Sequence, residues 1–227
     1  MNGEPTNLSI PSMNRLGVWS ASALFIVGAA YAVVVSIGIH ASGFSAPIVD
    51  PVLAVMEVLT LLSAPLLVLL MTAVHRSARS ADKPYAIAAL AFVVVFAGLT
   101  SAVHFVGLTA LRQSGSGEIV WPSPQYAVEL LAWDVFLGLS LLMAALTFRG
   151  GGLGRAIRIS SVATGILCLL GTLGPATGEM RLQFIAVVGY GIGLPVTCFL
   201  LSRFFKRAPA GVGGKPAVQH ALAADRG

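Results

Sequence analysis

Residues 51–75 read PVLAVMEVLTLLSAPLLVLLMTAVH, a run of 25 residues in which Glu57 is the only acidic side chain. About 20 apolar residues in a helix cross the hydrocarbon of a bilayer, so this run is long enough to span a membrane. Five other runs have similar length and composition. Together, the six predicted spans lie at about 16–40, 51–75, 84–111, 123–148, 156–178 and 182–205.

The composition of the whole chain supports a membrane protein. Hydrophobic residues make up 56% and charged residues 10% of the 227 residues, and the mean hydropathy is +0.88, which excludes an ordinary soluble domain. The runs are continuous and do not alternate apolar with polar residues, as strands of an outer-membrane barrel would. We therefore predict an all-α integral membrane protein, with one bundle of six transmembrane helices in residues 16–206.

The ends of the chain carry no further predicted domain. Residues 1–15 form a short tail, and the first apolar run is longer than that of a signal peptide, so we expect it to be retained as a helix. Residues 207–227 are rich in Ala, Gly and Pro without an apolar face, which predicts a disordered tail.

The distribution of basic residues predicts the orientation of the bundle. Twelve of the 14 lysines and arginines lie before span 1, after span 2, after span 4 or at and beyond the end of span 6, and the other two are Arg112 and Arg181. By the positive-inside rule, both termini are expected in the cytoplasm and the protein in the cell membrane as a multi-pass protein. The net charge of +5 then fits anionic lipid headgroups, and we expect membrane lipid but no nucleic acid as a partner. The sequence carries no signal for a particular oligomeric state.

The acidic residues inside the spans are Glu57, Glu129 and Asp134, and all three fall in the predicted outer half of the bundle together with His104. A carboxylate at the bilayer centre costs roughly 2.5 to 3.5 kcal/mol on insertion scales, so such a group in a small bundle indicates a function. At 1.5 Å per residue, Glu57 lies about 10 Å inward of Asp50. Three different spans therefore bring ionisable groups to similar depth.

The helical period predicts which of these groups share a face. Thr100 and His104 are four residues apart in the third span and lie on one face. Glu129 and Asp134 are five residues apart, and at about 100° per residue their side chains point about 140° from each other. These two carboxylates are therefore not expected to line the same narrow site.

A carboxylic acid in an apolar, water-poor cavity can stay protonated and donate its proton to a lipophilic substrate. Glu57 or Asp134 would be this acid, with His104 and Glu129 as further candidate catalytic groups. Aromatic rings in the neighbouring spans could shield a developing carbocation, and with a nearby hydroxyl they are the candidate substrate-binding residues. These residues are Trp133, Phe136, Phe105, Phe96, Tyr190 and Thr100.

The implied reaction is a proton-initiated isomerisation or cyclisation of an isoprenoid or sterol-like molecule, which needs no cofactor. Integral membrane terpene cyclases and sterol isomerases show that bundles of this size can host such chemistry, although no motif in this sequence identifies either family. The same groups also fit two other functions. They could relay protons in a proton-coupled transporter, with Pro65 and Pro195 opening helices, or the chain could be a noncatalytic membrane subunit or sensor.

Simpler interpretations of the polar residues also exist. Glu57 could pair with His104 as a structural bridge, and Glu129 could reach the membrane interface. A metal site of Glu57, His104 and Asp134 would lack the paired ligand spacing of known helical sites, so no metal is expected. His40 and His75 lie at helix ends on opposite sides of the membrane, which argues against a bis-histidine haem. The two cysteines, both inside spans, are expected to be packing residues.

Overall fold

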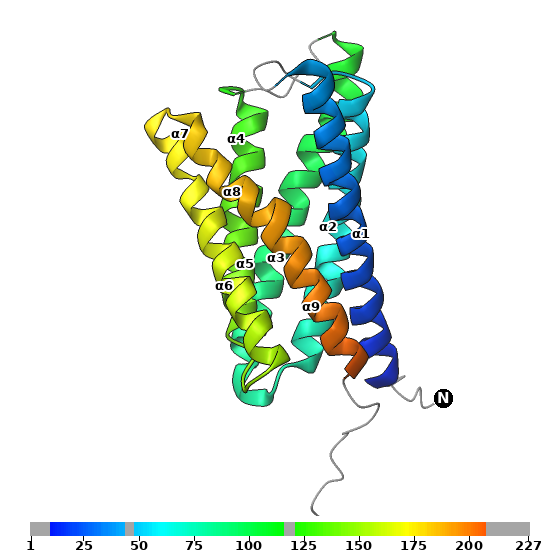
Figure 1. Ribbon diagram of the computed structural model, residues 1–227, viewed down its shortest axis with the longest axis vertical. Helices are drawn as coiled ribbons and strands as arrows, with labels where there is room; N and C mark the ends of the chain where they lie inside the picture. Colours follow the sequence, from blue (N-terminus) through cyan, green and yellow to red (C-terminus); the bar gives the residue numbers. More distant parts are fainter. Residues whose placement is uncertain (1–9, 44–47, 116–120, 208–227) are drawn as a thin grey trace, which may run out of the picture.

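The computed structural model describes residues 10–43, 48–115 and 121–207, which are helical apart from turns (Figure 1). Six helical stretches in this part of the chain are long and apolar enough to cross a membrane, which confirms the predicted six-helix membrane fold. They comprise Met13–Ser42, Val52–Ser77, Ser80–Leu111, Pro124–Ala145, Leu153–Thr177 and Met180–Arg207. The predicted disordered tail lies almost entirely outside the described residues.

Two spans are single helices and the other four contain more than one helical segment. The helices are α1 (Ile10–Ser42), α2 (Val52–Ser77), α3 (Lys83–Val106), α4 (Pro124–Leu130), α5 (Leu137–Ala145), α6 (Leu153–Gly171), α7 (Leu173–Thr177), α8 (Phe184–Val188) and α9 (Leu194–Arg207). Three π-helical segments, Gly107–Leu111, Leu131–Phe136 and Gly189–Gly193, interrupt or extend spans three, four and six. Short 3₁₀ turns at Ser80–Asp82 and Met180–Gln183 precede α3 and α8.

The first helix begins earlier than the predicted boundary at residue 16. It starts at Ile10, and Pro11 follows as its second residue. Proline is tolerated in the first helical turn, where its missing N–H has no intrahelical partner. Part of the predicted tail therefore belongs to α1.

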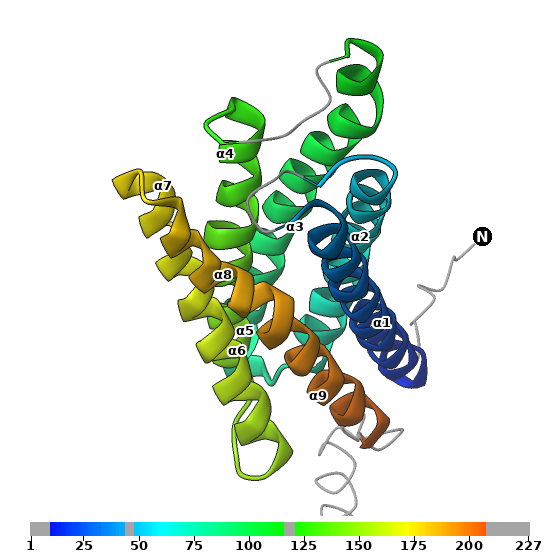
Figure 2. The ribbon, with the colours of Figure 1, turned by 45° about the horizontal axis from the view of Figure 1, so that its top comes forward.

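The helices form a closed ring at one end of the bundle and separate at the other. Along the chain, α1 packs on α2, α2 on α3, α3 on α5 and α5 on α6, and α9 returns to α1. Figures 1 and 2 show α1 and α9 together at the lower end and diverging toward the upper end. Gly28 lies at their contact, because a Cβ there would be 3.0 Å from Pro195 Cγ.

Small residues also allow α6 to approach the sixth span. A Cβ on Gly189 would meet Leu167 Cβ at 3.0 Å, and one on Gly193 would overlap Thr164. The pair Gly189 and Gly193 forms a G-x-x-x-G pattern, which allows this close backbone packing between helices.

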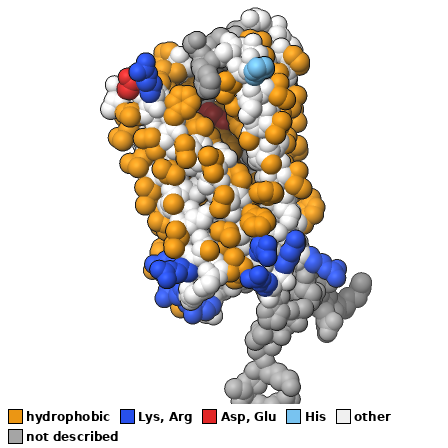
Figure 3. Space-filling model, in the orientation of Figure 1, with side chains coloured by type: hydrophobic (Ala, Val, Ile, Leu, Met, Phe, Trp, Pro, Cys, Tyr) orange, Lys and Arg blue, Asp and Glu red, His pale blue; other side chains and the backbone are white. Residues whose placement is uncertain are grey.

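The lower half of the bundle has a solid apolar core. Leu67, Leu70, Phe96 and Leu141 are at most 1% exposed and belong to one hydrophobic cluster. Below the core, Arg149 Nη2 donates to Asp82 Oδ1 at 2.7 Å and thereby joins the turn after α2 to the turn after α5. Figure 3 shows basic side chains gathered at this end, below a band of apolar side chains. We refer to this end as the inner end, in accordance with the predicted orientation.

Candidate functional site

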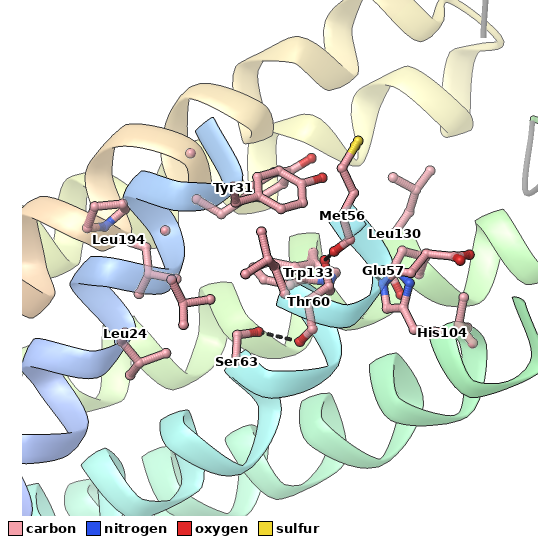
Figure 4. Close-up of a pocket in the computed structure, with 18 of the residues that line it drawn as sticks. Leu24, Tyr31, Met56, Glu57, Thr60, Ser63, His104, Leu130, Trp133 and Leu194 are labelled. Atoms are coloured by element: carbon pink, nitrogen blue, oxygen red, sulfur yellow. Dashed lines mark hydrogen bonds and ion pairs between the residues drawn. The ribbon is translucent and has the colours of Figure 1, made fainter. Parts of the chain in front are cut away.

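A cavity of about 300 Å³ lies between α1 and spans two, three, four and six, above the apolar core. Its wall is mostly apolar but includes two carboxylates, an imidazole and four aromatic rings other than histidine. The lining residues are Leu24, Val27, Gly28, Tyr31, Leu53, Met56, Glu57, Leu59, Thr60, Ser63, Val103, His104, Tyr126, Glu129, Leu130, Trp133, Gln183, Tyr190, Gly191, Leu194 and Pro195. Figure 4 shows Tyr31, Trp133, Glu57 and His104 around this space, and Figure 3 shows an acidic side chain recessed in a hollow of the upper half.

A hydrogen-bonded pair of His104 and Glu129 forms part of this wall. His104 Nε2 lies 2.8 Å from Glu129 Oε1, and the two side chains are only 12% and 18% exposed. With Glu129 ionised, the Nε2 nitrogen carries the proton of this hydrogen bond. The other ring nitrogen, Nδ1, is buried and has no hydrogen-bond partner among the described residues.

Two further side chains hold this pair in place. The Thr100 hydroxyl lies 3.1 Å from each oxygen of Glu129 and donates to the carboxylate, while Trp133 Nε1 donates to Thr100 Oγ1 at 3.0 Å. Thr100 and His104 lie one turn apart on α3, on one face as predicted. Glu129 and Trp133 are also four residues apart, so two spans meet along this polar seam.

Glu57 has a different partner. Its side chain is 2% exposed, and its Oε2 lies 2.5 Å from Arg112 Nη1. This separation defines an ion pair, although the orientation falls short of regular hydrogen-bond geometry. The alternative interpretation in which Glu57 bridges to His104 is wrong, because His104 pairs with Glu129.

Arg112 connects three parts of the chain. Its Nε and Nη2 donate to the two oxygens of Asp50 at 2.8 Å each, and its Nη1 donates to the carbonyl of Gly107. The guanidinium lowers the pKa of Asp50 below its usual value, chiefly through these hydrogen bonds. From the sequence, Arg112 indicated only the topology. The signal for its structural role was the seven-residue spacing of Glu57 in α2 and Asp50 just before α2, which on a continuous helix would place both carboxylates on one stripe.

Asp134 lies apart from the cavity. It is fully buried, is not a lining residue, and accepts no hydrogen bond from the described residues. Its Oδ2 faces the fifth span, where a Cβ on Gly171 would lie 3.1 Å away. The prediction that Glu129 and Asp134 do not line one site is therefore confirmed, and the candidate acid Asp134 is not in contact with the cavity.

The aromatic candidates separate into three groups. Trp133 and Tyr190 line the cavity with ring centroids 5.1 Å apart. Phe96 is buried behind Trp133, edge to face at 4.9 Å. Phe105 is 61% exposed, and Phe136 packs toward another phenylalanine ring, so neither belongs to the wall.

Sequence analysis missed three polar members of the wall. Tyr31 comes from α1, Tyr126 from the first turn of α4, and Gln183 from the turn before α8. The Gln183 amide donates to the Tyr190 hydroxyl at 3.1 Å. Each is an isolated residue near a span end or on the first span, so no periodic pattern in the sequence distinguishes it.

The π-helical segments contribute directly to the site. Trp133 lies within one of them, and Tyr190 and Gly191 lie within another. The third segment, Gly107–Leu111, ends immediately before Arg112. A π turn contains an extra residue and is frequent at functional sites, because it redirects the side chains that follow.

The described residues contain no group of three or more His, Cys, Asp or Glu side chains placed to hold a metal ion. No family model, curated protein or solved structure is significantly similar to this chain.

Proposed function

We propose that this protein is an intramembrane enzyme that isomerises a lipophilic small molecule by moving a proton. The observation that carries the proposal is the His104–Glu129 pair, hydrogen-bonded at 2.8 Å on the wall of a mostly apolar cavity. Imidazole can donate and accept a proton near neutral pH, and a carboxylate beside it fixes its orientation and protonated form.

The chemistry requires only proton transfer. One proton delivered to a carbon of an alkene and one removed from a neighbouring carbon shift the double bond without changing the composition of the ligand. No oxidant, reductant or cofactor is consumed. Thr100 and Trp133 act as positioning residues, since their hydrogen bonds orient Glu129, which in turn holds His104.

The wall of the cavity supports a lipophilic ligand of the isoprenoid or sterol-like class. Its volume of about 300 Å³ is at the lower end of typical ligand pockets, which span about 300 to 1,000 Å³. The reacting end of a longer molecule would therefore fill the cavity while its tail stays in the bilayer. The hollow that Figure 3 shows in the upper half of the bundle offers a lateral route for such entry.

The solid inner half favours an enzyme over a transporter. Leu67, Leu70 and Leu141 fill the core below the cavity, and the Asp82–Arg149 pair joins two turns at the inner end. A continuous pathway across the membrane would have to disrupt both the apolar core and this ion pair. A noncatalytic subunit or sensor would use the cavity without proton transfer, so one experiment can separate it from an enzyme.

The experiment follows deuterium from solvent into carbon. The purified protein is reconstituted in liposomes made from the total lipid extract of its expression host, transferred to D₂O, and sampled over time. Mass spectrometry then searches for a lipophilic species that gains deuterium over time. The deuterium must remain when the extracted lipid is exposed to H₂O, which shows that it is bound to carbon. We expect such a species with the wild type, and an initial rate about 100-fold lower with Glu129→Gln or His104→Gln, because general acid–base groups contribute about 10² to 10⁴.

The matched control is Glu179→Gln, which removes an exposed carboxylate near the same end of the bundle but outside the cavity. Its deuteration rate should equal that of the wild type. If no species gains deuterium above protein-free liposomes, or if Glu129→Gln deuterates at the wild-type rate, the proposed function is wrong.

A further inference from the structure

The cavity has an excess of acidic groups over basic ones. Its wall contains Glu57 and Glu129 but no lysine or arginine, and His104 is the one basic side chain there. This count of charged groups refers to the residues that the structure describes. Arg112 does not line the cavity but forms an ion pair with Glu57, which does.

Counting formal charges shows that this excess is not neutralised. The two carboxylates of the wall, Glu57 and Glu129, contribute −2, and Arg112, the ion-pair partner of Glu57, contributes +1, which leaves −1 with neutral His104. Charges in an apolar environment interact more strongly than in water, so a cation entering the cavity would be stabilised.

The aromatic side chains strengthen this preference. Tyr31, Tyr126, Trp133 and Tyr190 come from three different spans and line the same cavity as the two carboxylates. Ring faces attract cations, and such rings combined with carboxylates are the usual surroundings of bound ammonium groups. Trp133 is held by its hydrogen bond to Thr100 and by edge-to-face packing on Phe96, so this ring is fixed before a ligand arrives.

We infer that the cavity binds a lipophilic ligand that carries a positive charge, an amine or quaternary ammonium attached to an apolar chain. The ammonium would lie among the tyrosine and tryptophan rings near Glu129, with the apolar chain against Leu24, Leu194 and neighbouring aliphatic residues. This inference rests on the proposed function only in placing a lipophilic molecule in the cavity. It adds the charge of that molecule.

The buried Nδ1 of His104 agrees with this ligand class. In the neutral ring whose Nε2–H donates to Glu129, Nδ1 is an acceptor, and it has no donor among the described residues. A protonated amine would supply an N–H donor to it. A quaternary ammonium has no such donor and would depend on Glu129 and the aromatic rings.

The test compares two probes of the same shape. One is the dodecyl ether of choline, which ends in a trimethylammonium group. The other is the dodecyl ether of 3,3-dimethylbutanol, in which carbon replaces the charged nitrogen. Equilibrium binding is measured on the wild-type protein in lipid nanodiscs, with the probe concentration in the lipid calibrated on protein-free discs. We expect the cationic probe to bind about tenfold more tightly, which corresponds to about 1.4 kcal/mol.

Variants locate the source of the preference. Glu129→Gln and Tyr31→Leu should each reduce the ratio of the two affinities, whereas Glu179→Gln should leave it unchanged because Glu179 lies outside the cavity. The wild-type comparison needs no variant, so a variant that fails to fold does not affect it.

The outcomes separate this inference from the proposed function. Equal saturable binding of both probes would overturn the charge preference while leaving a lipophilic cavity in place. Absence of saturable binding for both would overturn the cavity as a ligand site and with it the basis of the proposed enzyme. A preference that Glu179→Gln abolishes but Glu129→Gln retains would assign the effect to surface potential and also overturn the inference.

Discussion

Replacing Arg112 with methionine tests the ion pair that joins the outer end of the third span to α2. The substitution removes the guanidinium and keeps an apolar stem, and it leaves Glu57 at 2% exposure without its partner. Breaking a buried ion pair on one side costs about 3 to 5 kcal/mol, because the remaining charge stays desolvated. The Arg112 side chain is 21% exposed, so we expect the lower end of this range, about 3 kcal/mol in the free energy of unfolding.

The second substitution in this test removes the stranded charge. Glu57→Gln in the Arg112→Met background should recover about 2 kcal/mol of the loss, since the amide is neutral and similar in shape. The free energy of unfolding can be measured by titrating sodium dodecyl sulfate into mixed micelles and following helicity by circular dichroism. The four proteins of the cycle then give the coupling between Glu57 and Arg112 directly.

The other partner of Arg112 serves as the control. Asp50 is 50% exposed, so Asp50→Asn should cost less than about 1 kcal/mol at neutral pH. Because Arg112 lowers the pKa of Asp50, the contribution of this pair is present above the ordinary pKa of aspartate and is lost as pH falls through the lowered folded-state pKa. Asp50→Asn should lack this part of the acid destabilisation. An Arg112→Met protein as stable as the wild type, or a double variant no more stable than Arg112→Met, would refute the reasoning.

Two other predictions concern packing and topology. Gly171→Ala should lower the free energy of unfolding by about 1 to 3 kcal/mol, because the added Cβ would overlap that of Ala186. Gly98→Ala is the control and should not lower it, since no atom lies within 4 Å of the new Cβ. Equal stability of the two variants in unfolding titrations would show that the helix contact is wrong. Single cysteines at Gly151 and Glu179 should react with a membrane-impermeant maleimide from the cytoplasmic and the outer side respectively, and the reverse pattern in intact cells would invert the predicted orientation. Both native cysteines are buried and should contribute little labelling.

The sequence determined the six spans and, within single spans, which polar side chains share a helix face. Length and apolarity of a run are local properties, and the bilayer requires both, so the number of spans could be predicted without knowing how they pack. The shared face of Thr100 and His104 and the separation of Glu129 from Asp134 also follow from the helical period within one span. These predictions needed no information from a second helix.

Only the tertiary structure decided which of these groups meet. His104 pairs with Glu129, Glu57 pairs with Arg112, and Asp134 lies outside the cavity. The order of contacts around a bundle depends on how six helix surfaces fit together, and the helical period of one span contains no information about its neighbours. The π segments add a second reason. One extra residue in a turn rotates the side chains that follow it by about 100°, and a prediction from the regular helical period does not include this shift.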